Sequence, residues 1–222
     1  MSQSRVVWGA YGVLTLLIAG IVLAPSRATL LPPWEQRLGR RIALSTDWNV
    51  FSSCLGQLPA ASVRIRFVRE VTEAVLATEN YSRPSWIQTV KFLVARVHYE
   101  LTGTLPDISL GLGQIKPKTA AKILRAAESG STVSQWELWR RLRGTCESVQ
   151  IVYFYFDQLL ADVEVNGELR PLQNPTIRAR VVDAVRRYNG QASNPSRRGV
   201  EDASDVYSTV VLQLAEWLEE GP

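Results

Sequence analysis

Helical spacing of apolar residues runs along most of the chain beyond its N-terminal quarter. Val68, Val71 and Val75 recur at intervals of three and four residues on one face of a predicted helix, and Glu79 continues that face. No alternation of apolar and polar residues lasts long enough to favour a sheet. The pattern predicts an all-α fold, with the folded domain over residues 62–222.

Further helices are predicted from the apolar stripes that follow. Gly103 stands where a helix from Pro84 to Leu101 would stop, and Pro117 suits the first turn of the next helix. Ser134 has the spacing of a cap, and Asn174 before Pro175 is the cap expected for a later helix. The apolar residues expected on these stripes are Trp86, Val90, Leu93, Val94, Val97, Leu101, Ala120, Ile123, Leu124, Trp136, Trp139, Leu142, Val149, Val152, Tyr153, Phe156, Leu160, Val163, Ile177, Val181, Val185, Val210 and Leu214.

The N-terminal segment lacks charge over the 19 residues from Val6 to Ala24. At about 1.5 Å per residue, such a helix just spans a hydrocarbon core of roughly 30 Å. Residues 1–28 are therefore expected to be a transmembrane anchor or a cleaved signal peptide. Either alternative places the domain across the bacterial inner membrane, in the periplasm or secreted. Prolines at 32, 33 and 59, with several polar breaks, predict a linker and a loosely structured entry segment over residues 29–61.

Composition narrows the function classes. The chain has 222 residues, with 25 basic and 21 acidic side chains, an excess that suits an anionic cell wall or lipid surface and is too small to indicate nucleic acid. Two cysteines and one histidine exclude a zinc-type cluster, and we expect no metal and no cofactor. Outside the cytoplasm, Cys54 and Cys146 can form a disulfide bond with each other. The alternative is that both cysteines are reduced and buried.

Three segments occur in an order that suggests one family. They read ATENYSRP at residues 77–84, SLGLGQIKPKTA at 109–120 and YNG at 188–190, the last with Tyr207 and Val210 downstream. Together they resemble the soluble-type lytic transglycosylases, relatives of goose-type lysozyme in the lysozyme-like superfamily. That family has a glutamate ending a helix, then a Ser-Gly-Gln-Ile-Pro-Thr-Ala loop, then a Tyr-Asn-Gly segment. The resemblance covers residues 62 to about 217 and implies a lysozyme-like helical domain.

The chain departs from that family pattern in two places. Between Glu79 and Ser109 lie 29 residues, including a whole predicted helix, where the family has a much shorter connection. The asparagine and glycine of the third segment also adjoin, whereas the family places a residue between them. We expect the extra helix after the catalytic glutamate to be an insertion that forms a wall or lid of the cleft.

Glu79 is the candidate catalytic acid on physical grounds as well. Glycosidic cleavage needs a carboxyl group that stays protonated near neutral pH, and the end of an apolar stripe withdraws Glu79 from water, which raises its pKa. The alternative is an exposed glutamate paired with Arg83. The resemblance implies that Glu79 alone serves as acid and then base in cleaving peptidoglycan, giving 1,6-anhydro-muramoyl products. A hydrolytic muramidase and a noncatalytic, membrane-tethered glycan-binding or scaffold protein remain the alternatives.

The loop residues have expected roles in binding the sugar. Gly111 and Gly113 let the backbone approach it closely, Gln114 offers a donor and an acceptor, and Ser109 can bond ring substituents. The resemblance places Tyr188 and Asn189 near Glu79. The expected partners are peptidoglycan glycan strands and, through the N-terminal segment, the membrane. No nucleic acid is expected, and an envelope protein partner stays unspecified.

Overall fold

The computed structural model divides into two compact units, Met1–Trp34 and Glu35–Pro222. Nearly every residue described here belongs to the second. The expected anchor or signal segment, residues 6–24, lies outside the described residues. No helix within the described ranges is long and apolar enough to cross a bilayer. The described residues are 34–58, 63–81, 83, 85–128, 130, 132–165, 170–189 and 198–220.

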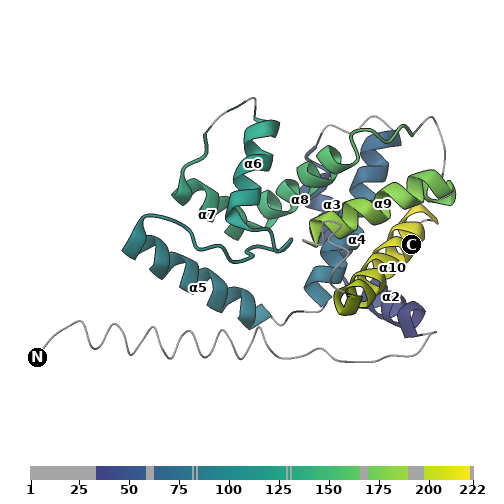
Figure 1. The fold of residues 1–222 in the computed structure, drawn as a ribbon, viewed down its shortest axis with the longest axis horizontal. Helices are drawn as coiled ribbons and strands as arrows, with labels where there is room; N and C mark the ends of the chain where they lie inside the picture. Colours follow the sequence, from purple (N-terminus) through teal and green to yellow (C-terminus); the bar gives the residue numbers. More distant parts are fainter. Residues whose placement is uncertain are drawn as a thin grey trace, which may run out of the picture. The chain divides into compact units, whose positions relative to one another are not determined.

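The described part of the chain is helical, as the apolar stripes predicted (Figure 1). Its extended pairing is limited to an isolated bridge between Leu110 and Ile115. The all-α class is therefore confirmed. The helices are α2 (Trp34–Ser45), α3 (Trp48–Leu55), α4 (Val63–Tyr81), α5 (Ser85–Thr102), α6 (Pro117–Ala127), α7 (Gln135–Arg143), α8 (Thr145–Leu159), the 3₁₀ turn η1 (Pro171–Gln173), α9 (Pro175–Tyr188) and α10 (Arg198–Glu220).

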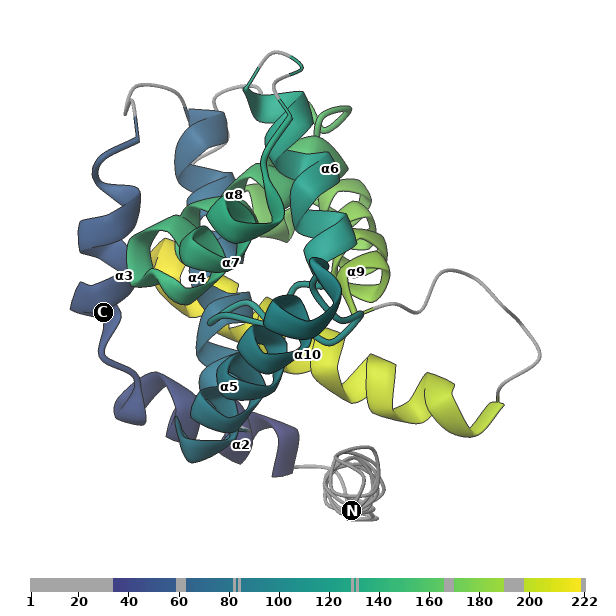
Figure 2. The same cartoon turned by 90° about the vertical axis from the view of Figure 1, so that its left-hand side faces the viewer.

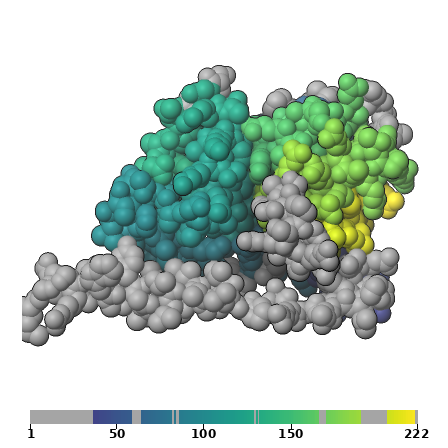
Figure 3. Space-filling model, viewed as in Figure 1, coloured from purple at the N-terminus to yellow at the C-terminus, as the bar shows by residue number. Residues whose placement is uncertain are grey.

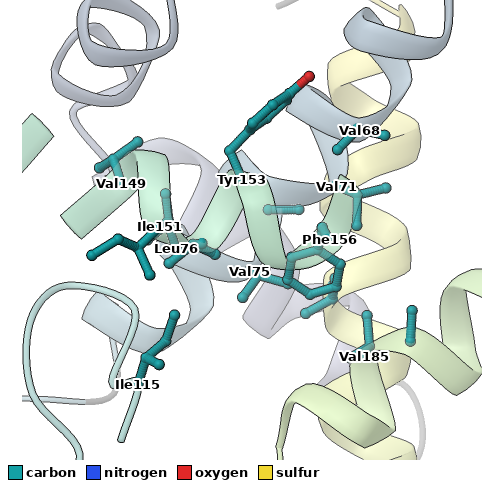
Figure 4. Close-up of a cluster of buried hydrophobic side chains, with 14 of the residues drawn as sticks. Val68, Val71, Val75, Leu76, Ile115, Val149, Ile151, Tyr153, Phe156 and Val185 are labelled. Atoms are coloured by element: carbon teal, nitrogen blue, oxygen red, sulfur yellow. The ribbon is translucent and has the colours of Figure 1, made fainter. Parts of the chain in front are cut away.

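Helix α4 forms the centre of the core. It packs against α3, α8 and α10, and the stripe of Val68, Val71 and Val75 has no exposed surface, as predicted. Figure 4 shows the α4 side chains gathered with those of α8, which include Phe156. Burying a large apolar side chain contributes about 1.5–3 kcal/mol, so this contact is a main source of stability and holds the last turn of α4 in place.

Two predicted caps position the later helices. The Ser134 hydroxyl accepts a hydrogen bond from the backbone N–H of Glu137 at the start of α7. The Asn174 side chain accepts from the N–H of Thr176 at the start of α9. Each bond satisfies a donor that has no partner inside its helix, which is why these residue types occur at helix starts.

The segment predicted as a linker, residues 29–61, instead contains two helices in its described part. Ile42 of α2 and Phe51 of α3 are buried in the core, and the Asp47 side chain caps α3 by accepting from the N–H of Asn49. The prolines that suggested a linker flank the two helices and do not interrupt them. The polar residues between the apolar ones are the solvent faces of short helices.

Helix α5 matches the predicted inserted helix, but its apolar stripe does not face the core. Leu93 and Leu101 are each 62% exposed, and Trp86 is 55% exposed. The helix instead contacts α7 through its opposite face, where Phe92 and Tyr99 lie against tryptophan rings. Figure 2 shows α5 at the side of the domain nearest the viewer, and it lies on the surface in Figure 3.

Cys54 and Cys146 form a disulfide bond, which selects one of the two alternatives that the sequence left open. The bond ties α3 to the first turn of α8 across 92 residues of chain. Because a crosslink between residues so far apart lowers the conformational entropy of the unfolded chain, it stabilises the folded state relative to the unfolded one.

We predict that replacing both cysteines by alanine lowers the free energy of unfolding by about 2–5 kcal/mol, because the unfolded chain regains the entropy of the long loop. Urea unfolding of the variant and of the oxidised parent measures the difference. Thiol titration of the denatured, unreduced protein should find no free sulfhydryl. Titratable thiols, or equal stability of parent and variant, would contradict the prediction.

Candidate active site

Glu79 lies in the last turn of α4, and its side chain is only 6% exposed. One carboxylate oxygen, Oε1, accepts a hydrogen bond of 3.0 Å from the hydroxyl of Tyr207 on α10. The other, Oε2, lies 3.2 Å from Nη2 of Arg83. The alternative reading of an exposed glutamate is therefore wrong about exposure, although the pairing with Arg83 exists.

Burial raises the pKa of Glu79 above its ordinary value of 4.5. Three neighbours act in the opposite direction: the charge of Arg83, the hydrogen bond from Tyr207 and the charge of Lys91. Burial outweighs them because removing a carboxylate from water penalises only its charged form. A glutamate held in this way keeps its proton to a higher pH than an exposed one does, as a general acid requires.

The segment after α5 closes into a tight loop that faces this carboxyl group. Leu110 and Ile115 exchange backbone hydrogen bonds of 3.0 and 3.1 Å at its base. Gly111 and Gln114 both have positive φ, at 74° and 51°. The Gln114 side chain folds back so that its Nε2 donates to the Gly111 carbonyl oxygen at 2.6 Å. This bond fixes the amide with its oxygen directed away from the loop.

The two glycines, expected from the sequence to let the backbone approach a sugar, pack closely against helices of the protein instead. A Cβ on Gly111 would collide with the Ser148 hydroxyl and lie 2.6 Å from the Leu142 carbonyl oxygen. A Cβ on Gly113 would collide with Val152 and lie 2.9 Å from the Tyr188 hydroxyl. The space that the glycines leave is thus filled by α7, α8 and α9, and these helices hold the loop from behind.

Arg83 and Lys91 link the loop to the catalytic candidate. Arg83 Nη1 and Lys91 Nζ both donate to Oε1 of Gln114, the lysine at 2.6 Å. Since Arg83 also contacts Glu79, the carboxyl group and Gln114 share a charged partner. Burial, with the charge of Arg83 second, lowers the pKa of Lys91 to about 8, while the charge of Glu79 acts in the opposite direction.

Of the remaining predicted site residues, Tyr188 contacts the loop, whereas Ser109 and Asn189 have no described contact with Glu79. The Tyr188 hydroxyl donates to the Gly113 carbonyl oxygen, and burial raises its pKa well above 10. Ser109 is partly buried at the base of the loop, and no described hydrogen bond joins its side chain to Glu79. Asn189 is exposed at the end of α9, where its backbone N–H bonds the Val185 carbonyl oxygen. The structure therefore joins Gln114 to Glu79 through Arg83 and places Tyr188 against the loop at Gly113, while Gly111 packs against α7 and α8.

Other carboxyl groups considered from the sequence lie apart from Glu79. Glu100 pairs with Arg96, and Asp107 pairs with Lys116; both acidic side chains are more than half exposed. Within the described ranges, the charges that shift the pKa of Glu79 come from cations. This arrangement fits a mechanism that uses one carboxyl group.

The Glu79 carboxyl group is almost fully buried in this conformation. A cavity of about 330 Å³ lies beside η1, α9 and α10, where Arg178 and Glu216 form an ion pair in its lining. Near Glu79, the bonds from Arg83 and Lys91 to Gln114 tie α5 and the end of α4 to the loop.

None of the protein-family models, curated proteins or solved structures compared with the chain matches it. The case for a function therefore rests on the residues and contacts described here. Two of them, Lys91 and the role of Tyr207, were not predicted as parts of the site. Tyr207 lies in the last helical stripe, and its position next to Glu79 depends on how α10 crosses α4.

The backing of the loop by α7 and α8 can be tested with two glycines of nearly equal φ. Gly111 (74°) is packed, whereas Gly103 (71°) has nothing within 4 Å of an added Cβ. Alanine at either position costs about 1–2 kcal/mol for the left-handed backbone, and Gly111→Ala should cost a further 1–3 kcal/mol or so from overpacking. Urea unfolding of the two variants checks this, and equal losses would contradict it.

The raised pKa of Glu79 makes stability depend on pH. The folded state holds this proton more tightly than the unfolded state, so the free energy of unfolding falls as pH rises from about 4.5 through the folded-state pKa. Glu79→Gln removes this dependence, so its free energy of unfolding should rise relative to that of the parent as the pH increases from about 4.5. Denaturant unfolding across this range measures the difference. Exposed Glu100 supplies the control variant, Glu100→Gln, and an equal trend in both variants would refute the claim.

Proposed function

We propose that this protein is a peptidoglycan lytic transglycosylase that cleaves the bond between N-acetylmuramic acid and N-acetylglucosamine, with Glu79 as acid and base. The observation that carries the proposal is the position of Glu79, buried in the last turn of α4 and joined through Arg83 to Gln114 of the loop. A single carboxyl group with a raised pKa beside a glycine-bearing, amide-bearing loop is the arrangement that this reaction needs.

The proposed reaction uses one carboxyl group twice, first as acid and then as base. Glu79 first gives its proton to the glycosidic oxygen, and the bond from that oxygen to the muramoyl C1 breaks. The muramoyl C6 hydroxyl then attacks C1, and the Glu79 carboxylate takes up the hydroxyl proton. The products are an N-acetylglucosamine end and a 1,6-anhydro-muramoyl end, no water is consumed, and Glu79 returns to its protonated form.

The neighbours of Glu79 suit its change of charge between the two steps. While it is a carboxylate, Arg83 and the Tyr207 hydroxyl stabilise the negative charge from opposite oxygens. While it is protonated, burial favours the neutral form. No second carboxyl group holds a water molecule in the proposal, which distinguishes it from a hydrolytic muramidase on the same fold.

We predict that the purified full chain releases soluble fragments from murein sacculi, and that Glu79→Gln lowers this rate by at least about a hundredfold, since an amide cannot donate the proton. Mass spectrometry of the fragments identifies the chemistry. Anhydro-muramoyl ends support the proposal, and reducing muramoyl ends would indicate a hydrolase.

The matched control is Glu100→Gln, which removes an exposed carboxyl group of α5 that pairs with Arg96. It should digest sacculi at the parent rate. Intact sacculi with every protein would favour a noncatalytic glycan-binding or scaffold role. Full activity in Glu79→Gln would remove the residue from the mechanism.

A further inference from the structure

Two cations converge on one uncharged oxygen at the candidate site. Oε1 of Gln114 accepts hydrogen bonds from both Arg83 and Lys91. A carboxamide oxygen carries only a partial negative charge, so it compensates two full positive charges poorly. Two like charges held so close repel each other, and the charge of Arg83 contributes to the lowered pKa of Lys91.

The compensating negative charge is incomplete. Arg83 pairs with Glu79, but within the described ranges Lys91 forms no ion pair with a carboxylate. Lys91 is also partly buried, so water does not fully replace the missing partner. When Glu79 takes up the proton that the reaction requires, neither cation retains a carboxylate partner among the described residues.

We propose that Arg83 and Lys91 form a carboxylate-binding subsite that selects the muramoyl unit of the substrate. A carboxylate there would replace the Gln114 oxygen and compensate both cations, with the planar guanidinium group able to offer two parallel N–H donors. The inference rests on the proposed function, because it names which part of that substrate the pair would hold.

The chemistry of the two sugars gives the subsite its purpose. The muramoyl unit carries a lactyl ether, whose carboxyl group is free in peptide-free strands and linked to a stem peptide in others. The peptide brings carboxylates of its own, whereas N-acetylglucosamine carries none. A subsite for this anion next to Glu79 would set which of the two alternating glycosidic bonds faces the acid.

Binding to the full chain with Glu79→Gln tests the subsite without turnover, and the amide represents the protonated acid. Calorimetry compares four tetrasaccharides: peptide-free N-acetylglucosamine–N-acetylmuramic acid, its lactyl methylamide, the stem-peptide form, and an N-acetylglucosamine tetramer. We expect at least one carboxylate form to bind about tenfold more tightly than both neutral forms, equivalent to about 1.4 kcal/mol. Which carboxylate form gains identifies the lactyl group or the peptide as the source.

Variants in the same background assign the preference to this pair. Lys91→Met should reduce it to within about twofold, and Lys91→Arg should retain it because the charge stays. Lys122→Met, an exposed lysine of α6, should leave it unchanged. Equal binding of charged and neutral saccharides by Glu79→Gln overturns the inference, and so does a full preference in Lys91→Met.

The two proposals fail separately. Sacculi cleaved by the parent protein, without any carboxylate preference in Glu79→Gln, would leave the transglycosylase standing and remove the subsite. A carboxylate preference lost in Lys91→Met, together with sacculi that stay intact, would leave an anionic glycan-binding site and remove the catalytic role.

Discussion

The burial of one carboxyl group at the end of α4 is the constraint on which the site depends. A helix end is where water usually has access, yet Glu79 is only 5% exposed, with Tyr207 of α10 and Arg83 against its two carboxylate oxygens. The cost of desolvating its charged form is opposed by Arg83, Tyr207 and Lys91. The balance between burial and these three groups sets the protonation state of Glu79, and any movement of α5 or α10 changes that balance.

The sequence predicted what depends on neighbours along the chain. The α4 stripe and the caps at Ser134 and Asn174 follow from local spacing and backbone chemistry, and each occurs in the structure. The tight packing of Gly111 and Gly113 against α7, α8 and α9 depends on tertiary contacts and was not predicted. Periodicity also placed α5 correctly, but it identifies only which face of a helix is apolar. Whether another element covers that face depends on tertiary contacts, and for α5 none of the described elements covers Leu93.

The parts of the site that sequence reasoning missed are long-range. Lys91 belongs to an inserted helix without a family motif, and Tyr207 lies 128 residues from the glutamate that it contacts. Neither has a local pattern that distinguishes it from an ordinary surface lysine or core tyrosine. The disulfide is similar, because two cysteines 92 residues apart are compatible with pairing or with none until α3 and α8 are brought together.

The exposed stripe of α5 also affects how easily this helix can detach from the domain without global unfolding. Among the described side chains of this helix, only Ala95 is buried, so detaching α5 forfeits little apolar burial while α4 and α8 stay packed. Segments with few buried contacts open at a fraction of the global unfolding free energy. Since Lys91 is carried on α5, such an opening would admit water and solutes to Glu79 while the core remained folded. The free energy needed to expose Glu79 by this route is therefore the cost of detaching α5, which is separate from the cost of unfolding the packed α4 and α8.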